Sequence, residues 1–578
     1  MGTSLTTSRA GVALCLAVFL TIAALFLILN RAAYKGYFQD DELDNISWTP
    51  HVNGETWIKG FLSPRLDRDN FRPTGHLYFD EMARHFGLDF PKYLVPVHLI
   101  HLLNALLIAL LARTLKAGWV AALTAAAFFA LNVAVFDAYW KPMYVFDVLC
   151  AFFCLLSMLL FAQGRWILSL IAFWLAYKSK ELAVMLPMAL ALYEFWFGER
   201  RFKRLVPFFL ISLSFGLQGI LLNPAKDNAY TFRFNLQSLQ ATVPFYASRL
   251  LLIPYGGLAI LALAVLRDRR IWFGVATLCL FFFPLLFLPG RLYPAYCYVP
   301  LTGAAVALAG LVSIGERAHW RPLIPAVLLA FAIWIPWNIR ELRIDRAATL
   351  GPDDETRTFV SGIRKYAQAH PDPAPFIYDA APAILHHWGV TAAVHIAYDR
   401  LDVPVFYSDT VEGQQALRGT SLILLDWDTL RHRVRFNARY LNTKDASYIA
   451  MGEKAPVWQL ISGWLGGNEY FQWIQPKATA YLQRPANARR FELFANVSPE
   501  LIRKLKRTSV TVSLDGTTLG ETSFTEPGHH RVEWQLPAGA PGKTQVDFQV
   551  VPAFHPERDS RNLGIAVIAF GFLPREES

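Results

Sequence analysis

Long apolar stretches separated by short polar segments fill the first 340 residues of the chain. The first, Gly11–Leu29, is nearly twenty residues long, which predicts an uncleaved membrane-spanning helix rather than the shorter core of a signal peptide. Cleavage after Ala23 or Ala24 is the alternative. Similar stretches lie near 93–112, 118–136, 143–162, 165–177, 182–198, 205–222, 243–266, 271–288, 295–315 and 321–338. We therefore expect a membrane all-α bundle of about eleven helices over residues 1–340, with kinks at Pro187, Pro254 and Pro284.

From about residue 339 the sequence becomes polar and predicts two further segments outside the membrane. Residues 341–454 combine a helical stretch, Asp354–His370, with short strand-like runs at 375–378, 403–407 and 422–425, which indicates a small α/β segment. Pro404 limits the second of these runs to an edge strand.

Residues 455–578 carry short alternating runs at 490–494, 510–514, 530–535, 546–550 and 564–570. Asp515-Gly516 stands where a hairpin turn belongs. This last domain is predicted to be a β-sandwich of jelly-roll type. Four of its tryptophans could stack on sugar rings, although such residues more often belong to a core: Trp458, Trp464, Trp473 and Trp534.

Composition supports a membrane protein. Hydrophobic residues make up 54% of the 578 residues and charged residues only 17%, below the roughly one quarter of soluble domains. A purely soluble enzyme is excluded. All five cysteines lie in or beside apolar stretches, which excludes a disulfide-stapled ectodomain and a Cys-rich zinc site.

Basic residues are distributed unevenly between alternate loops. With the N-terminus in the cytoplasm, the inner loops carry Arg113, Lys116, Arg165, Arg200, Arg201, Lys203, Arg204, Arg267, Arg269, Arg270, Arg317 and Arg321. The outer loops carry fewer: Lys141, Lys178, Lys180, Lys226, Arg233 and Arg291. The positive-inside rule accounts for this asymmetry, and for much of the net charge of +10, without a nucleic-acid partner. We expect a bacterial inner-membrane protein with the loop 31–92 and the C-terminal domain in the periplasm.

The loop 31–92 contains the most concentrated chemistry. Asp40, Asp41, Glu42 and Asp44 place four carboxylates within five residues near the membrane face. These carboxylates repel one another, so the cluster must either lie in open water, as in a simple solvated loop, or be stabilised. A metal, a basic ligand or a raised pKa of one carboxyl group would stabilise it. Arg72 follows in the same loop, and beyond it His98, His101 and Asn104 share one face of the next apolar helix, where they imply a polar contact inside the bundle.

These motifs resemble those of the GT-C superfamily of polytopic glycosyltransferases, and most closely its protein O-mannosyltransferase-like branch, which includes transmembrane transferases with tetratricopeptide repeats. The matching elements are Asp40-Asp41, Phe71-Arg72-Pro73, His98 to Asn104, Ser179-Lys180-Glu181 with Leu186-Pro187, and Arg291 to Pro300, which contains Tyr293, Tyr296 and Tyr298. The resemblance covers about residues 10–340. Two departures leave the acceptor open, because the repeats are absent and Phe-Arg-Pro replaces Tyr-Arg-Pro.

The resemblance implies transfer of a hexose or pentose from a polyprenyl-phosphate sugar to a glycan, glycolipid or protein acceptor on the outer face. Asp40 or Asp41 would act as the general base, and Lys180 and Arg291 would hold the donor phosphate. Residues expected to line the site are Glu42, Asp44, Arg72, His98, His101, Glu181, Tyr293 and Tyr298. Each cation could instead be an interfacial snorkelling residue, and the tyrosines an aromatic belt. The sequence establishes no cofactor with certainty, although Asp40 and Asp41 could bind a divalent cation, as in some GT-C enzymes.

Two other classes of function compete with this interpretation. An O-antigen ligase or polymerase also has many helices, but its large loop tends to come late rather than directly after the first helix. A non-enzymatic transporter or lipid flippase would be favoured by internal repeats, and the sequence contains none. Neither the sugar nor the acceptor follows from the sequence.

Overall fold

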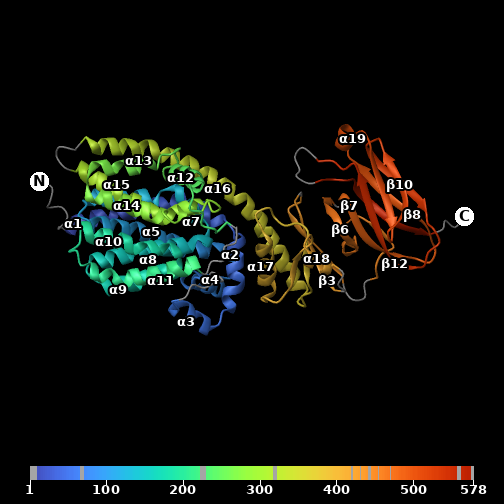
Figure 1. Cartoon of the computed structure of the whole chain (residues 1–578), viewed down its shortest axis with the longest axis horizontal. Coiled ribbons are helices and arrows are strands. Elements are labelled where there is room, and N and C mark those ends of the chain that lie inside the picture. Colours follow the sequence, from blue (N-terminus) through green and yellow to red (C-terminus); the bar gives the residue numbers. More distant parts are fainter. Residues whose placement is uncertain are drawn as a thin grey trace. The chain divides into compact units, whose positions relative to one another are not determined.

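The structure is a computed structural model that describes residues 9–64, 71–221, 229–316, 322–417, 421–429, 431–439, 444–452, 455–468, 470–555 and 562–574. Lys226, Arg317 and Arg321 of the predicted loops lie outside the described residues. The chain divides into two compact units, Met1–Asp354 and Glu355–Ser578. The first unit is helical, and every strand among the described residues belongs to the second (Figure 1).

The α-helices of the first unit are α1 (Arg9–Leu29), α2 (Asp40–Trp48), α3 (Gly54–Leu62), α4 (Pro73–Phe86), α5 (Phe90–Thr114), α6 (Trp119–Ala130), α7 (Phe136–Trp140), α8 (Val145–Ala162), α9 (Trp166–Ser179), α10 (Leu186–Trp196), α11 (Val206–Leu221), α12 (Leu236–Leu250), α13 (Leu258–Ala262), α14 (Arg269–Phe282) and α15 (Tyr298–Gly315). A further helix, α16 (Leu323–Ala369), begins in the first unit and continues into the second. Short 3₁₀ turns connect them: η1 (Arg31–Lys35), η2 (Thr49–His51), η3 (Val133–Val135), η4 (Pro142–Tyr144), η5 (Glu181–Met185), η6 (Phe202–Leu205), η7 (Leu263–Leu266), η8 (Leu285–Phe287) and η9 (Pro294–Cys297).

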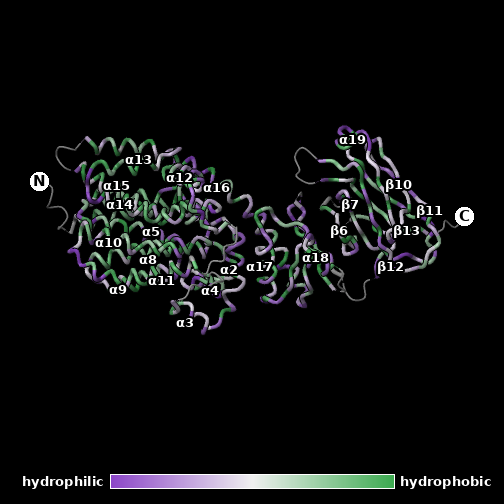
Figure 2. Tube along the Cα trace, in the orientation of Figure 1, coloured by the Kyte–Doolittle hydropathy of each residue, from purple (hydrophilic) through white to green (hydrophobic). Residues whose placement is uncertain are grey.

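Five helical segments among the described residues are long and apolar enough to cross a membrane: Gly11–Leu29, Phe90–Thr114, Pro142–Ala162, Arg269–Phe287 and Pro294–Gly315. A sixth is Trp119–Ala130 with Val133–Trp140, if that pair, bent by 42°, is one span. Hydrophobic residues dominate these helices (Figure 2). The count of eleven stays a prediction, since helices such as α9 and α11 are shorter, and α10 begins only at Leu186, after η5, with Pro187 in its first turn.

Small residues let two of the spanning helices, α14 and α15, approach closely. A Cβ atom on Gly274 would lie 2.3 Å from the backbone nitrogen of Ala307, and one on Gly303 would lie 2.4 Å from that of Leu278. Glycine is the residue that permits such backbone contact between membrane helices. This packing holds α15 against α14, and α15 follows the segment with Arg291 and Tyr296.

The last apolar helix does not end where the composition changes. α16 runs without a break from Leu323 to Ala369 and includes the stretch that the sequence predicts as a separate helix from Asp354. Its polar half contains many helix-forming Arg, Glu and Ala residues, and the helix continues through Gly351 and Pro352, which ordinarily disfavour a helix interior. The boundaries at 340 and 454 stay predictions, and the two compact units meet within α16, after Asp354.

The second unit contains a four-stranded sheet with the order β2-β1-β3-β4, formed by β1 (Phe376–Tyr378), β2 (Val405–Tyr407), β3 (Leu422–Asp428) and β4 (Arg433–Arg439). Strands β1, β2 and β3 run parallel and β4 antiparallel. Helices α17 (His387–Tyr398) and α18 (Val411–Ala416) complete this α/β segment. The edge position predicted from Pro404 is confirmed, because β2 ends the sheet.

The remaining strands form one nine-stranded sheet, in which β10-β9-β12-β7-β13-β8-β11 is the main order and β5 and β6 pair with β13 and β7. Their bounds are β5 (Tyr448–Ala450), β6 (Leu460–Asn468), β7 (Phe471–Arg484), β8 (Ala488–Val497), β9 (Thr508–Leu514), β10 (Thr517–Phe524), β11 (Gly528–Gln535), β12 (Gly542–Val551) and β13 (Ala566–Pro574), with η11 (Val457–Gln459) before β6 and α19 (Pro499–Leu505) after β8.

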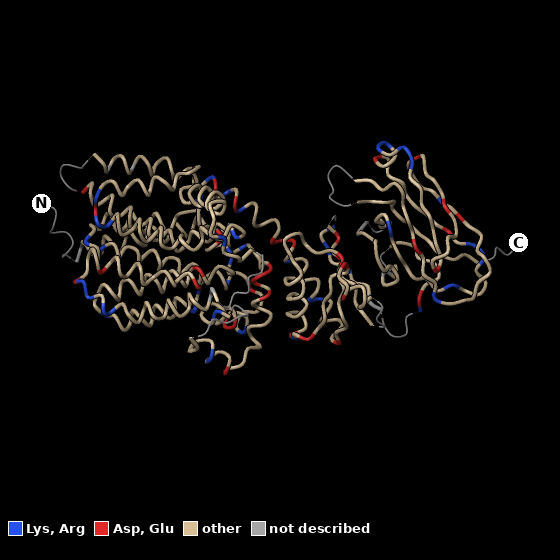
Figure 3. Tube along the Cα trace, in the orientation of Figure 1, with Lys and Arg blue, Asp and Glu red and all other residues tan. Residues whose placement is uncertain are grey.

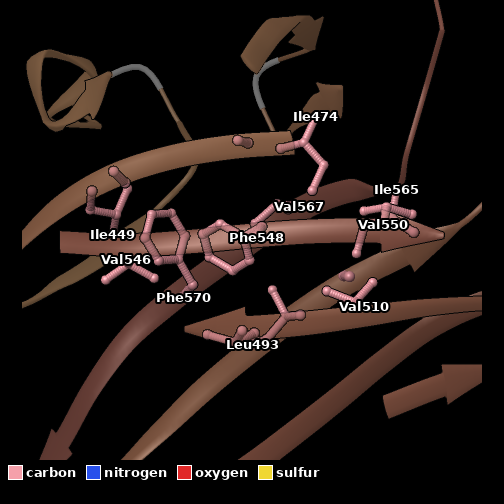
Figure 4. Packing of buried hydrophobic residues seen from close by; sticks show 14 of the residues in the cluster. Ile449, Ile474, Leu493, Val510, Val546, Phe548, Val550, Ile565, Val567 and Phe570 are labelled. Atoms are coloured by element: carbon pink, nitrogen blue, oxygen red, sulfur yellow. The ribbon is translucent and has the colours of Figure 1, made fainter. Parts of the chain in front are cut away.

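This sheet curves around a single apolar core (Figure 4). Phe548 of β12 and Phe570 of β13 have ring centroids 5.1 Å apart, although β7 lies between their strands in the sheet order. Trp464 stacks on Phe570, and Trp458 is buried in a second apolar cluster, so both belong to the interior. The β-rich C-terminal region is confirmed, while its jelly-roll topology stays a prediction.

Candidate active site

Helix α2 carries the predicted acidic cluster and begins at Asp40. Helices α2, α3 and α4 lie at one end of the helical unit (Figure 1). A group of Lys and Arg residues lies at the opposite end, near the start of α1 (Figure 3). Asp40 is only 8% exposed, whereas the neighbouring Asp41 is exposed. Acidic residues in a first helical turn are favoured by the helix dipole, which helps α2 to hold three of them there.

Asp44 lies one turn further along the same helix. Burial and, to a smaller extent, the nearby Asp41 and Asp40 raise its pKa to about 6, against a hydrogen bond with Trp48 that lowers it. The carboxylates of α2 therefore repel one another. In a fully solvated loop, water and salt would screen this repulsion.

Glu42 points into the protein rather than toward solvent. One carboxylate oxygen accepts a hydrogen bond from the backbone nitrogen of Gln39 (2.5 Å), and the other from that of Met143 (3.2 Å), in η4. Burial raises the pKa of Glu42 to about 8, so its carboxyl group is largely protonated at pH 7. These contacts make Glu42 the anchor of α2 to the segment that precedes α8.

A second anchor comes from α16. The carboxylate of Asp353 accepts hydrogen bonds from the backbone nitrogen of Tyr37 and from Nε2 of Gln39, both at 3.0 Å. Asp353 is 1% exposed. Sequence reasoning missed this residue, and no sequence signal distinguishes it from the other acidic residues of α16.

The two cations predicted to hold the donor phosphate meet at one aromatic ring. Nζ of Lys180 lies 4.4 Å from the centroid of Tyr296, and the hydroxyl oxygen of Tyr296 accepts hydrogen bonds from Nε and Nη2 of Arg291 at 3.0 and 2.8 Å. Tyr296 thus connects residues that are 111 positions apart. The side chain of Tyr293, 41% exposed, lies beside the same guanidinium, with 4.9 Å between ring centroid and Cζ.

Lys180 also has a carboxylate partner that sequence reasoning missed. Its Nζ donates to both carboxylate oxygens of Asp147 at 2.6 Å, and the side chains of the pair are 15% and 3% exposed. A lone aspartate in an apolar helix such as α8 is the signal that could have identified Asp147, because intramembrane carboxylates are rare and usually paired.

The predicted Phe-Arg-Pro and Ser-Lys-Glu elements lie against each other. Arg72 donates from Nε and Nη2 to the two carboxylate oxygens of Glu181 at 2.8 and 3.1 Å, a two-pronged ion pair. Burial alone would raise the pKa of Glu181, but Arg72 holds it below its usual value. Next to this pair, the Thr74 hydroxyl donates to that of Ser179 at 2.8 Å. The first loop is therefore fixed to the residues that flank Lys180.

One short segment joins the acidic helix to the cationic cluster. Met143 contacts Glu42 of α2, and Asp147, four residues later, holds Lys180. Four residues correspond to about one helical turn, or about 6 Å. The carboxylates of α2 and the cations around Tyr296 thus border the same part of the unit.

His98, His101 and Tyr298 form a separate buried network. Nε2 of His98 donates to the carbonyl oxygen of Tyr139 (2.8 Å), so its Nδ1 accepts from the Tyr34 hydroxyl (2.9 Å). The same logic makes Nδ1 of His101 the acceptor of the Tyr298 hydroxyl (2.7 Å), since its Nε2 bonds a backbone carbonyl. All four ring nitrogens are satisfied, and this network connects α5 with η1, α6, α7 and the first residue of α15 rather than with Lys180 or Arg291.

No group of three or more His, Cys, Asp or Glu side chains arranged to hold a metal ion occurs within the described ranges. A divalent cation on Asp40 and Asp41 stays a prediction.

No protein-family model matches the sequence, and no curated protein sequence matches it. Among solved structures, the chain is similar to ArnT from Cupriavidus metallidurans bound to undecaprenyl phosphate, with 15% identity, 73% of this chain and 94% of that chain covered, and a TM-score of 0.42. The apo form of ArnT gives 12% identity, coverage of 74% and 98%, and a TM-score of 0.44. The arabinofuranosyltransferase AftD from Mycobacteria gives 13% identity, coverage of 97% and 59%, and a TM-score of 0.45. These similarities concern the backbone fold alone. The description of the site above uses only the contacts within this chain.

Proposed function

We propose that the protein is an integral membrane glycosyltransferase of GT-C type that moves a sugar from a polyprenyl-phosphate donor to an acceptor hydroxyl on the outer, periplasmic face. The observation that carries the proposal is the convergence of Lys180 and Arg291 on Tyr296, next to the segment that anchors the acidic helix α2. A cationic site beside carboxylates, at the ends of apolar helices, suits a substrate with a lipid tail and a phosphate head.

The proposed chemistry divides the work between the two groups of residues. Asp40 or Asp41 accepts the proton of the acceptor hydroxyl, whose oxygen attacks the anomeric carbon of the donor sugar. The bond between this carbon and the phosphate oxygen breaks, and polyprenyl phosphate leaves with the electron pair. Lys180 and Arg291 stabilise the negative charge that grows on the phosphate.

Both cations have donor capacity for a phosphate. An ammonium group has three N–H donors and a guanidinium has five. Within the described parts of the chain, Lys180 directs Nζ to the two oxygens of Asp147, and Arg291 directs Nε and Nη2 to Tyr296. These bonds do not use one N–H of Lys180 or the Nη1 group of Arg291, and we assign these donors to the phosphate oxygens.

The alternatives are an O-antigen ligase or polymerase and a non-enzymatic transporter. Only the proposed function requires a polyprenyl-phosphate sugar to be consumed as the donor. The test is to incubate membranes containing the protein with a labelled polyprenyl-phosphate sugar. We expect the label to leave the lipid and to appear on an acceptor glycan, glycolipid or protein. Membranes containing the Lys180→Ala/Arg291→Ala variant are the control and should leave the donor intact. Equal donor loss with and without the protein would refute the proposal.

A further inference from the structure

A cavity of about 130 Å³ lies in the second unit, at the carboxyl ends of two parallel strands. Strand β1 ends at Tyr378 and is followed by Asp379, and β2 ends at Tyr407 and is followed by Ser408 and Asp409. Asp379, Ser408 and Asp409 all line the cavity. In open α/β sheets, ligands bind outside the carboxyl ends of the strands. The topology alone therefore marks this edge as a binding position.

The polar wall of the cavity is held in place by hydrogen bonds between the two strand ends. The Ser408 hydroxyl donates to Oδ1 of Asp379 (2.8 Å), and the Ser408 backbone nitrogen donates to the carbonyl oxygen of Tyr378 (2.9 Å). Gln414 of α18 donates from Nε2 to the Ser408 carbonyl oxygen (2.7 Å). A ligand would meet the Asp379 carboxylate already positioned, which lowers the entropic cost of binding.

Another part of the cavity is largely apolar and comes from β6. Trp464 and Leu460 line it, and Leu425 of β3 and the buried ring of Tyr378 continue the apolar surface. A concave site that combines apolar and aromatic side chains with a few fixed polar groups is typical of small-molecule binding. A sugar ring fits this combination, because it presents hydroxyl donors at its rim and C–H groups on its faces.

The charge of the lining restricts the ligand further. Asp379, Asp409 and Asp426 face one basic residue, Arg435, which makes the lining net negative by two charges. Arg435 forms an ion pair with Asp426. Anionic ligands are therefore disfavoured, whereas hydroxyl and ammonium groups can donate to the carboxylates.

We propose that this cavity binds a single sugar residue that is neutral or carries an amine. The site is separate from the cationic cluster of the helical unit, and the inference does not depend on the transfer reaction. The Asp379 and Asp409 carboxylates accept hydrogen bonds from the sugar, and the wall around Trp464 covers one of its faces.

The test measures binding of glucose, glucosamine and glucuronate to the full-length protein in detergent micelles, by saturation-transfer NMR and titration calorimetry. Glucosamine and glucose should bind saturably with a Kd on the order of 1 mM, and glucosamine more tightly. Glucuronate should not compete. The Asp379→Asn/Asp409→Asn variant should weaken glucosamine binding by at least about tenfold, since it removes two charged acceptors while keeping their shape.

Asp402→Asn is the matched control, because Asp402 lies in the same α/β segment, is paired with Arg400 and does not line the cavity. Its affinity should equal that of the unmodified protein. If the double variant does not fold, the single variant Asp409→Asn is measured in its place. It should also weaken the binding of glucosamine. Absence of saturable binding for all three sugars, equal binding of glucuronate, or an unchanged affinity in folded Asp409→Asn would each overturn the proposal.

Discussion

The ion pair between Lys180 and Asp147 offers a substitution whose effects on stability and on activity can be separated. Lys180→Met removes the ammonium group and leaves a carboxylate with 3% side-chain exposure. Removing one partner of a buried pair costs about 3–5 kcal/mol, because the remaining charge is left without compensation. Methionine has a similar length, so little of the loss comes from an empty cavity. We expect a clear drop in thermal stability.

The double variant Lys180→Met/Asp147→Leu should recover that stability. Replacing both charges of a buried pair by apolar side chains of similar volume is often neutral or stabilising. Transfer should nevertheless stay low, because the cation proposed to hold the donor phosphate is absent. A lost charge-assisted hydrogen bond of about 1.5–3 kcal/mol corresponds to donor binding weaker by about tenfold to a hundredfold.

The assays are thermal unfolding in detergent, followed by tryptophan fluorescence, and transfer from a labelled polyprenyl-phosphate sugar. Lys178→Met is the control, since Lys178 lies two residues away on α9 and donates to the carbonyl oxygen of Ser63. It should keep transfer activity. A double variant that regains both stability and full transfer would refute the role of Lys180 toward the donor and leave it a purely structural residue.

Three further predictions concern packing, pH and topology. Gly303→Val should destabilise the helical unit by about 1–3 kcal/mol in thermal unfolding, because its Cβ would lie 2.4 Å from the backbone of Leu278, and unchanged stability would contradict the packing of α14 on α15. Because burial raises the pKa of Glu42 to about 8, the folded state binds more protons than the unfolded state, and stability should fall as pH rises from about 4.5 to about 8. Glu42→Gln should flatten this dependence, and an equally steep profile in that variant would exclude Glu42 as its source. Reporter fusions at Gly198 and Leu350 should mark the cytoplasmic and outer sides, and a cytoplasmic signal at Leu350 would contradict the predicted orientation.

Features that depend on neighbouring residues could be predicted from the sequence. Asp515 and Gly516 have φ values of 47° and 79°, the left-handed pair that a two-residue hairpin requires, and they join β9 to β10 as expected. Pro404 lacks an N–H donor, and the strand that follows it lies at a sheet edge. By contrast, the change of composition near residue 339 marks where α16 leaves its apolar part, not where the helix ends.

Contacts between distant segments could not be read in this way. The motifs indicated that Lys180 and Arg291 belong to one site, but their common partner Tyr296 and the carboxylate of Asp147 depend on how separate helices pack. The contact of Asp353 with Tyr37 spans 316 residues and leaves no trace in local sequence. Periodicity finds the helices, whereas the pairing of their polar side chains is decided by tertiary structure.

The most direct test of the proposed function is single-turnover transfer from a bound, labelled polyprenyl-phosphate sugar by Asp40→Asn, Asp41→Asn and the double variant. Loss of a general base slows turnover by about a hundredfold to ten-thousandfold, so one single variant should be nearly inactive while still binding donor. Asp89→Asn, at the N-terminus of α5 and outside the acidic cluster, is the control and should be mild in effect. Full transfer by a folded, membrane-inserted double variant would contradict the assignment of the base and remove the mechanism proposed for this protein.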